Sequence, residues 1–235
     1  MSVGGSARRP RMSLTELRVA PSILSADFAR LGAQVGEVLA AGARVIHVDV
    51  MDGHFVPPIT FGPVAVSAIA DQVHEAGGIV DVHMMIERPD RQVADIAKAG
   101  ADNITVHVEA TPHLHYVLAA IREAGATAGA AICPATPADV LAEVAQDTLD
   151  LALCMSVNPG WGNQEFIANS LSKLARMRAA LPDHVGLEVD GGIHEATVSK
   201  VARAGANLLV AGSAVFGADD PGQAYAALVA GARGQ

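Results

Sequence analysis

Short apolar runs alternate with alanine-rich amphipathic segments from Arg18 to the end of this chain, and this alternation constrains the fold more than any other feature. Eight runs have the length and apolar content of buried strands: residues 18–21, 44–50, 80–84, 103–108, 127–132, 151–156, 186–189 and 208–211. Eight segments between and after them have helical periodicity: residues 28–41, 64–75, 91–99, 115–123, 137–145, 164–180, 195–204 and 221–232. Strands that alternate with helices predict parallel pairing, and eight such units in 235 residues predict a single (β/α)8 TIM barrel of the α/β class.

Glycines mark the ends of several predicted helices. Gly42, Gly100, Gly125 and Gly205 each lie between two alanines, where a left-handed residue ends a helix before the next strand. The alternative architecture, a doubly wound open sheet, is disfavoured because no Gly-x-Gly-x-x-Gly motif follows the first strand. We expect a disordered tail rather than an export signal over residues 1–13 and one barrel domain over residues 14–235. Whether the chain starts at Met1 or at Met12 stays open.

Charge and composition exclude several classes of partner. The formal net charge of −9 argues against a nucleic-acid partner, which requires clustered Lys and Arg. The sequence contains no apolar run near the roughly 20 residues that span a membrane. The spacing of Cys133 and Cys154 fits neither a zinc knuckle nor a disulfide framework, so a reduced, cytoplasmic setting is expected.

Three predicted strands carry His and Asp at a spacing of two residues or at their carboxyl ends. His47 and Asp49 lie on the second strand, His83 follows Asp81 on the third, and Asp190 ends the seventh. Side chains two residues apart project from the same face of a strand, and active sites of (β/α)8 barrels gather where the strands end. These side chains are therefore expected to meet at one mouth of the barrel.

A convergence of two imidazoles and two carboxyls predicts a metal site. A single His or Asp at a strand end is more simply a hydrogen-bonded structural residue. Four of them together in an apolar barrel would be costly unless they were paired or bound to a cation. His47, Asp49, His83 and Asp190 offer mixed nitrogen and oxygen ligation, which suits one divalent ion and does not distinguish Zn, Fe(II), Mn and Co.

Glycine-containing turns after the last two strands predict a phosphate site. Gly191-Gly192 follows the seventh strand and Gly212-Ser213 follows the eighth, where TIM barrels commonly bind phosphate through backbone N–H groups. The simpler alternative for Gly191-Gly192 is a tight turn. All three lysines of the chain, Lys98, Lys173 and Lys200, fall in predicted helices. This placement disfavours a Schiff-base aldolase and leaves backbone and hydroxyl groups to hold a phosphate.

Six motifs in order along the chain resemble the ribulose-phosphate 3-epimerase family. They are APSILSAD at 20–27, HVDVMDGHFVP at 47–57, DVHMM at 81–85, MSVNPG at 155–160, EVDGG at 188–192 and AGSAVF at 211–216. The resemblance runs from about residue 20 to the end of the chain. It implies a TIM barrel of the ribulose-phosphate-binding type that self-associates. It also implies a metal-dependent isomerase of carbohydrate metabolism, in the pentose phosphate pathway, that interconverts D-ribulose 5-phosphate and D-xylulose 5-phosphate.

The resemblance also implies roles for individual residues. Asp49 and Asp190 would be the acid/base pair that moves the C3 proton through an enediolate, and they would hold the metal together with His47 and His83. Residues implied to contact the substrate are Ser22, His83, Gly160, Trp161, Gly162, Asn163, Asp190, Gly191, Gly192, Gly212 and Ser213. Met51, Met85 and Met155 would form a cap that excludes water, where the alternative is flexible core packing.

Three positions depart from the family pattern. Trp161 and Asn163 stand in the loop after the sixth strand where the family typically has Phe and Gly, and Cys133 stands where it usually has Asn. The altered loop leaves open a 3-epimerase of another ketose phosphate, such as a tetrulose or hexulose phosphate. A non-catalytic barrel that binds a sugar phosphate is the alternative outside the enzymes.

Overall fold

The computed structural model describes residues 13–234, and over these residues eight parallel strands form a nearly closed barrel. The strands are β1 (Arg18–Pro21), β2 (Val45–Met51), β3 (Ile79–Met85), β4 (Asn103–His107), β5 (Thr127–Ile132), β6 (Leu151–Met155), β7 (Gly186–Asp190) and β8 (Leu208–Ala211). Their order is β1-β8-β7-β6-β5-β4-β3-β2, and a parallel bridge between Ser22 and His47 joins the two ends of this series. The predicted TIM barrel is confirmed.

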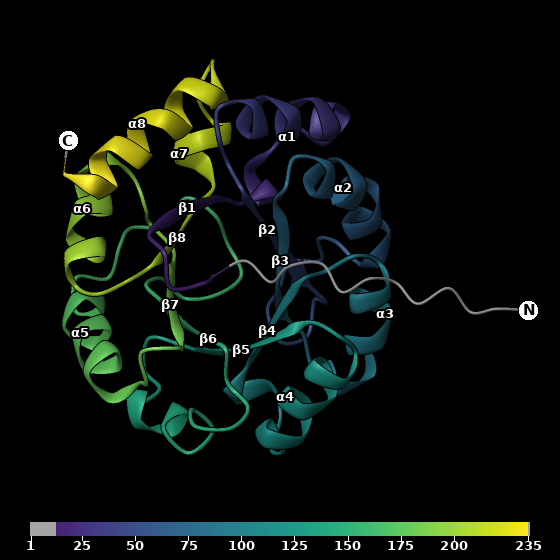
Figure 1. Ribbon diagram of the computed structural model, residues 1–235, viewed down its shortest axis with the longest axis vertical. Helices are drawn as coiled ribbons and strands as arrows, with labels where there is room; N and C mark the ends of the chain where they lie inside the picture. The colour runs from purple at the N-terminus through teal and green to yellow at the C-terminus, as the bar shows by residue number, and fades with distance from the viewer. Residues whose placement is uncertain (1–12, 235) are drawn as a thin grey trace, which may run out of the picture.

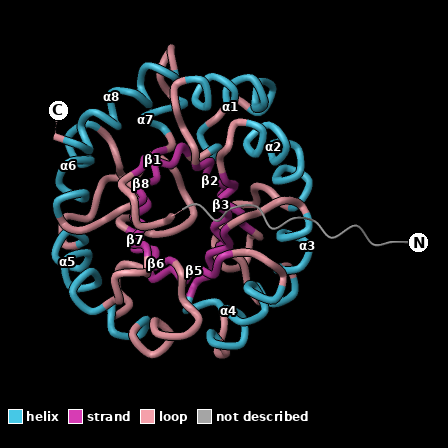
Figure 2. Tube along the Cα trace, in the orientation of Figure 1, coloured by secondary structure: helices cyan, strands magenta, loops and turns pink. Residues whose placement is uncertain are grey.

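The helices form a ring outside the strands (Figures 1 and 2). They are α1 (Leu31–Ala40), α2 (Pro63–Glu75), α3 (Val93–Lys98), α4 (Leu114–Glu123), α5 (Ser170–Ala180), α6 (Glu195–Arg203), α7 (Ser213–Phe216) and α8 (Pro221–Arg233). Alternate strand residues such as Ile46, Val48 and Val50 belong to the large apolar core that the helices cover. His47 and Asp49, between them in sequence, take the opposite face and point into the barrel, as period-two alternation predicts.

The inside of the barrel changes from apolar to polar along its axis. A small apolar cluster that includes Ala20, Val45, Ile79, Leu151 and Leu208 lies near the amino-terminal ends of most strands. The next layers toward the carboxyl ends are polar, and their members are buried: His47, Asp49, Asp81, His83, Asn103, Thr105, His107 and Glu188. The structure therefore places titratable groups between an apolar floor and the mouth.

Two predicted helices differ from the structure. Residues 137–145 contain only a 3-10 helix, Ala138–Leu141, which continues as turns in which the Val144 N–H donates to the Leu141 carbonyl. Leu141 and Val144 are both buried at a spacing of three, which suits three residues per turn. The helix predicted over 164–180 begins only at Ser170. Four-residue α7 is too short to be recognised by periodicity.

The predicted tail over residues 1–13 lies outside the described residues apart from Ser13. Within residues 13–234, no helix combines the length and the apolar character needed to cross a membrane.

Candidate active site

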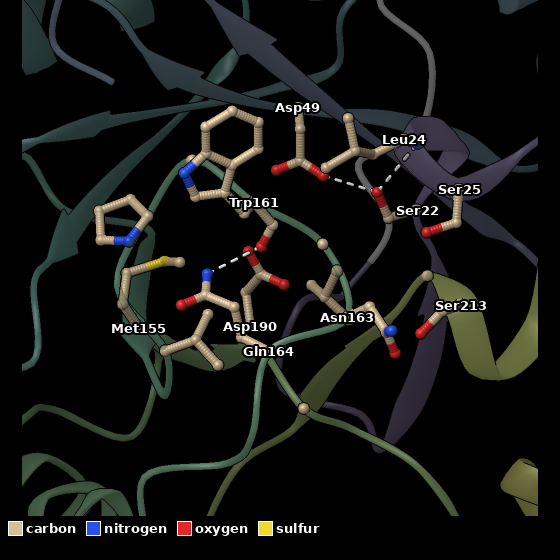
Figure 3. A pocket seen from close by; sticks show the side chains of 18 of the residues that line it. Ser22, Leu24, Ser25, Asp49, Met155, Trp161, Asn163, Gln164, Asp190 and Ser213 are labelled. Atoms are coloured by element: carbon tan, nitrogen blue, oxygen red, sulfur yellow. Dashed lines mark hydrogen bonds between the residues drawn. The ribbon is translucent and has the colours of Figure 1, made fainter. Parts of the chain in front are cut away.

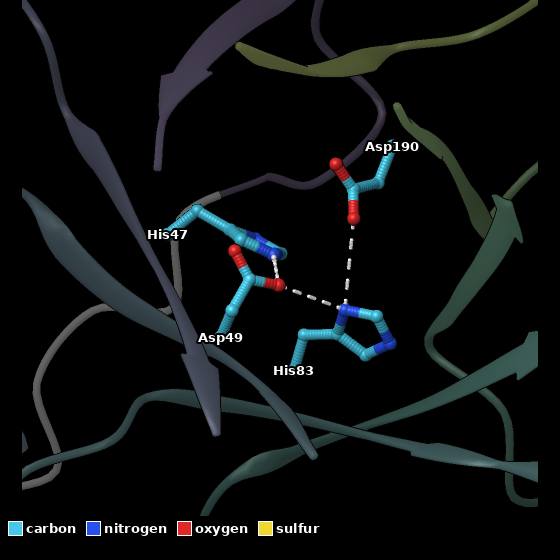
Figure 4. Close-up of side chains that lie close together, drawn as sticks. All are labelled: His47, Asp49, His83 and Asp190. Carbon is cyan, nitrogen blue, oxygen red and sulfur yellow. Dashed lines mark hydrogen bonds and ion pairs between the residues drawn. The ribbon is translucent and has the colours of Figure 1, made fainter. Parts of the chain in front are cut away.

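The four predicted metal ligands meet at the carboxyl ends of β2, β3 and β7 (Figure 4). His47, Asp49, His83 and Asp190 each offer one ligand atom, and these atoms lie within 4.8 Å of one another. Asp49 Oδ1 is 3.3 Å from His47 Nε2 and 3.1 Å from His83 Nδ1, and His83 Nδ1 is 3.8 Å from Asp190 Oδ2. The sequence prediction that these side chains converge is confirmed by this geometry.

A hydrogen bond behind His47 orients its ring toward the cluster. His47 Nδ1 lies 2.7 Å from Asp81 Oδ2, and Asn103 Nδ2 donates to the other Asp81 oxygen at 2.5 Å. Because Nδ1 faces the Asp81 carboxylate, Nε2 is the ring nitrogen that faces Asp49 and would be available to a metal ion. Carboxylates in this position commonly fix the tautomer of a metal-ligating His.

The two carboxyl groups of the cluster differ in their ionisation. Burial alone would raise the pKa of Asp49, but His47 and His83 beside it hold that pKa well below its usual range. Burial and the nearby charge of Asp49 raise the pKa of Asp190 to about 7. Around neutral pH the site therefore holds one charged carboxylate and one carboxyl that readily carries a proton, the arrangement expected of an acid/base pair.

The chemistry of the donor set fits a divalent cation. Burial opposes charge on His47, yet Asp49 and Asp81 raise its pKa well above its usual value. A proton on His47 thus balances the negative charge of the cluster, and a cation bound by the same atoms would replace it. Two imidazole nitrogens and two carboxylate oxygens suit Zn, Fe(II), Mn or Co. His47, Asp49, His83 and Asp190 could therefore hold a metal ion.

Glu188 is a fully buried carboxyl in the layer below the cluster. Neither of its oxygens accepts or donates a hydrogen bond within residues 13–234, and Oε1 lies 3.4 Å from His47 Nδ1. Burial, followed by the negative charge of Asp81, raises the pKa of Glu188 well above its usual value. Burial therefore favours the neutral form of Glu188.

Replacement of Glu188 by Gln is expected to stabilise the protein increasingly as the pH rises. The folded-state pKa lies above the unfolded value, so the contribution of Glu188 is fully present below the unfolded pKa and is lost as pH rises toward the folded pKa. Gln keeps a donor and has no charge to bury. The gap in unfolding free energy should grow with pH by at most about 1.4 kcal/mol per unit. Urea unfolding at pH 4.5, 6 and 8 measures it, with exposed Glu123→Gln as the matched control. A gap independent of pH would show that Glu188 is charged in the fold.

Asp49 and Asp190 of the cluster line a pocket at the same mouth (Figure 3). Ser22 Oγ donates to Asp49 Oδ2 at 2.6 Å and accepts from the Leu24 N–H at 3.3 Å, which holds the carboxylate in place. Every residue predicted to contact substrate lines the pocket except His83, which is buried beneath the lining. Met51, Met85 and Met155 also line it.

The pocket lining extends beyond the residues predicted to contact substrate. The additional residues are Leu24, Ser25, Val157, Asn158, Pro159, Gln164, Ile193, His194 and Val210. Ser25 lies in the first motif, and a Cβ at Gly212 would come within 2.7 Å of its Oγ, so the turn after β8 lies directly beside this motif. Gly191, at φ +114°, would place a Cβ 2.4 Å from Val157 Cγ2, which ties this turn to the loop after β6. No Lys or Arg is among the described residues that line the pocket.

The loop after β6 keeps a glycine-like backbone in spite of its unusual residues. Asn163 adopts φ 58°, the left-handed region that Asn tolerates better than most residues. Gln164 Nε2 donates to the carbonyls of Asn158 and Trp161 at 2.6 and 2.8 Å, so its side chain holds the loop together. Trp161 is 60% exposed at the edge of the pocket. Trp161 therefore adds an exposed indole at the edge of the pocket, and Asn163 occupies a backbone conformation that glycine also adopts.

Fold and site together define a TIM-barrel enzyme with a candidate metal centre among the carboxyl ends of its strands. A family model described as the ribulose-phosphate 3 epimerase family matches residues 18–216. The chain belongs to the ribulose-phosphate 3-epimerase family, and the enzyme is accordingly an isomerase of the epimerase type.

Similar proteins support this assignment over nearly the whole chain. Ribulose-phosphate 3-epimerase of Bacillus subtilis (strain 168) is 50% identical over 209 residues, which cover 87% of this chain and 94% of that protein. The protein of the same name from Synechocystis sp. (strain ATCC 27184 / PCC 6803 / Kazusa) is 52% identical over 221 residues, covering 92% of each. Orotidine 5'-phosphate decarboxylase from Pyrococcus horikoshii OT3 has a similar fold, with a TM-score of 0.69 at 17% identity over 92% of this chain and 100% of that one.

Proposed function

We propose that this protein interconverts D-ribulose 5-phosphate and D-xylulose 5-phosphate by moving the proton at C3 between Asp49 and Asp190. The observation that carries the proposal is the pair of carboxyl groups on β2 and β7, which belong to one His/Asp cluster, differ in ionisation and both line the pocket. β8 and β1 separate these two strands in the barrel, so the carboxyls reach the pocket from different directions.

Inversion at C3 requires a base on one face of the carbon and an acid on the other. The C3 hydrogen is acidic because it lies next to the C2 ketone. One Asp accepts that proton, the electron pair left on C3 forms the enediolate, and the other Asp returns a proton to the opposite face. The two residues exchange roles in the reverse direction, because each epimer presents its hydrogen to the other side.

The residues that would hold a divalent cation are His47, Asp49, His83 and Asp190. Such a cation supplies electrostatic stabilisation of the negative charge that develops on the substrate oxygens, which a proton-transferring side chain does not provide. Asp81 and Ser22 support this arrangement by orienting His47 and Asp49 through their hydrogen bonds.

Three methionines are proposed to keep water away from the enediolate. Met51, Met85 and Met155 end β2, β3 and β6, line the pocket, and are at most 3% exposed. Their flexible, polarisable side chains would close over an uncharged face of the intermediate without offering it a proton. The loop that contains Trp161 would complete the cover from the solvent side.

The phosphate is proposed to bind between the turns that follow β7 and β8. Gly191, Gly192, Gly212 and Ser213 line this side of the pocket. With no lysine or arginine among its described lining residues, the pocket would have to hold the phosphate through backbone N–H groups and hydroxyls. Because the donors belong to the barrel itself, the phosphate would also fix the position of C3 relative to the two carboxyls.

The test is NMR of D-ribulose 5-phosphate in D2O with metal-loaded protein. We expect deuterium to appear at C3 together with D-xylulose 5-phosphate, because both proton transfers exchange with solvent. Unphosphorylated D-ribulose is the control and should react far more slowly, since it lacks the group that positions C3.

Absence of C3 exchange with D-ribulose 5-phosphate would contradict the proposed substrate. The same assay with tetrulose and hexulose phosphates then identifies a different ketose phosphate, the alternative that the altered Trp161 loop leaves open. A metal-loaded protein that exchanges no member of the panel would be a sugar-phosphate-binding barrel without turnover.

A further inference from the structure

A chain of two further side chains leads away from His83 on the side opposite to the cluster. His83 Nε2 lies 2.9 Å from Nε2 of His107, the last residue of β4. His107 Nδ1 lies 3.0 Å from Glu109 Oε2, in the 3-10 helix Val108–Ala110. Both imidazoles are fully buried, and the ring of Phe55 packs on His107 with centroids 4.8 Å apart. His83 belongs to the predicted site, whereas His107 and Glu109 do not.

The proton positions in this chain follow from counting donors. Two ring nitrogens 2.9 Å apart can share only one proton, because two N–H groups would repel. A His83 ring that binds a cation through Nδ1 must carry its proton on Nε2. His107 Nε2 must then accept that proton's hydrogen bond, so the proton of the neutral His107 ring is on Nδ1 and is donated to Glu109.

Glu109 is fixed in the orientation that this chain requires. Its Oε1 accepts from the Cys133 N–H at 2.8 Å and from the Thr136 hydroxyl. The other oxygen, Oε2, is thereby directed to His107. An ionised carboxylate can only accept hydrogen bonds, and the hydrogen bonds from His107 and Thr136, which outweigh its desolvation, lower the pKa of Glu109 to about 2.

We propose that Glu109 and His107 are positioning residues that set the tautomer of His83, so that its Nδ1 lone pair faces Asp49 and Asp190. The inference rests on the proposed metal site, and it extends that site by two residues of β4 and the turn after it. Outer partners of this kind commonly change metal affinity by about 10–100-fold. Asp81 acts on His47 through a direct hydrogen bond, whereas Glu109 would act on His83 through the imidazole of His107.

The same proton count excludes a second cation beside the first. His107, Glu109 and Cys133 offer three ligand atoms within 4.8 Å of one another, and Cys133 Sγ lies 3.6 Å from His107 Nδ1. A cation there would need the Nδ1 lone pair of His107, which would move the proton of His107 to Nε2 and against the N–H of His83. Lys173 also places an ammonium group next to this cluster, 2.7 Å from the Cys133 carbonyl. A second cation at His107, Glu109 and Cys133 is therefore not expected.

The isosteric change Glu109→Gln tests the inference. The remaining side-chain oxygen can still accept from the Cys133 N–H and Thr136, which turns the amide N–H toward His107. His107 would then accept at Nδ1 and donate from Nε2, and His83 would carry its proton on Nδ1, against the cation. The expected result is zinc affinity about 10–100-fold below wild type, measured by competition with a chromophoric chelator. Glu123→Gln, with the same charge change on the exposed face of α4, should bind zinc as wild type does.

Two other measurements keep the inference falsifiable if Glu109→Gln does not fold. Long-range proton–nitrogen NMR of zinc-loaded wild type should find the His107 proton on Nδ1, and a proton on Nε2 would overturn the inference. Zinc analysis should give one ion per chain in wild type and in Cys133→Ala. Two ions per chain in wild type and one in Cys133→Ala would show that the His107 cluster binds a metal, which would overturn the inference.

The outcomes separate this inference from the proposed function. If wild type binds one zinc and Glu109→Gln binds it equally tightly, the positioning role fails while the metal site stands. If wild type binds no zinc, the metal site itself fails and the inference with it.

Discussion

Asp190→Asn is expected to abolish epimerisation while leaving the fold intact, with kcat lower by about 10²–10⁴-fold. Asn has nearly the same shape and can neither accept nor return the C3 proton. Asn carries no charge, and the Asp190 side chain is 17% exposed at the end of β7. The free energy of unfolding should therefore change little. Turnover in both directions, measured on protein reloaded with metal, gives the result.

Exchange in D2O makes the same variant informative about mechanism. Asp49 remains able to remove a proton from the epimer whose C3 hydrogen faces it, so that epimer should still exchange slowly without inverting. The other epimer should not exchange. Asp49→Asn should show the reverse preference. Asp219 is exposed and does not line the pocket, so Asp219→Asn should behave as wild type. A well-folded Asp190→Asn protein with near-wild-type turnover would contradict the two-carboxylate model.

Removal of bound metal by a chelator is expected to lower turnover by about 10³-fold or more, because cations in such sites contribute several kcal/mol to transition-state stabilisation. Readdition of Zn, Mn or Co should restore it, and the ion that restores it best identifies the preferred metal. The stripped protein should remain folded, since a proton on His47 balances the cluster when no cation is bound.

Full activity in protein with negligible metal content would contradict this prediction. Circular dichroism before and after stripping separates loss of chemistry from loss of fold. Stripped protein that also unfolds would instead assign the cation a mainly structural role, so both measurements are needed on the same sample.

Much of the fold follows from local signals in the sequence. The bounds of β1, β5 and β8 agree with the predicted runs, and those of the other strands differ by one residue at one or both ends. This accuracy has a physical basis, because buried parallel strands are continuous apolar runs and glycines end the preceding helices. The helices predicted after β5 and β6 were wrong in extent. Residues 138–141 form a 3-10 helix instead of an α-helix, and the segment before Ser170 is held in the loop after β6 because Gln164 donates to the Asn158 carbonyl and the Ile167 N–H donates to the Ser156 carbonyl.

The candidate site was partly readable for the same reason. His47, Asp49, His83 and Asp190 stand out because each interrupts or ends an apolar strand. His107 ends β4 in the same way and could have been found by that signal, with Glu109 two residues later. The partnership of His107 with His83 depends on the side-chain packing between β3 and β4, which single-sequence patterns do not give. Self-association of the chain stays a prediction.

The join between β1 and β2 has a consequence for how the molecule becomes active. In the described part of the chain these two strands share no ladder, and the bridge between Ser22 and His47 links them. Ser22 also holds Asp49, and His47 is itself a candidate ligand. The seam that closes the barrel thus lies beside the groups that would hold the ion. β1 supplies no ligand itself, but without it between β8 and β2 the ladder would not hold Asp190 of β7 near His47 and Asp49 of β2, so tight binding of the ion would require the closed barrel.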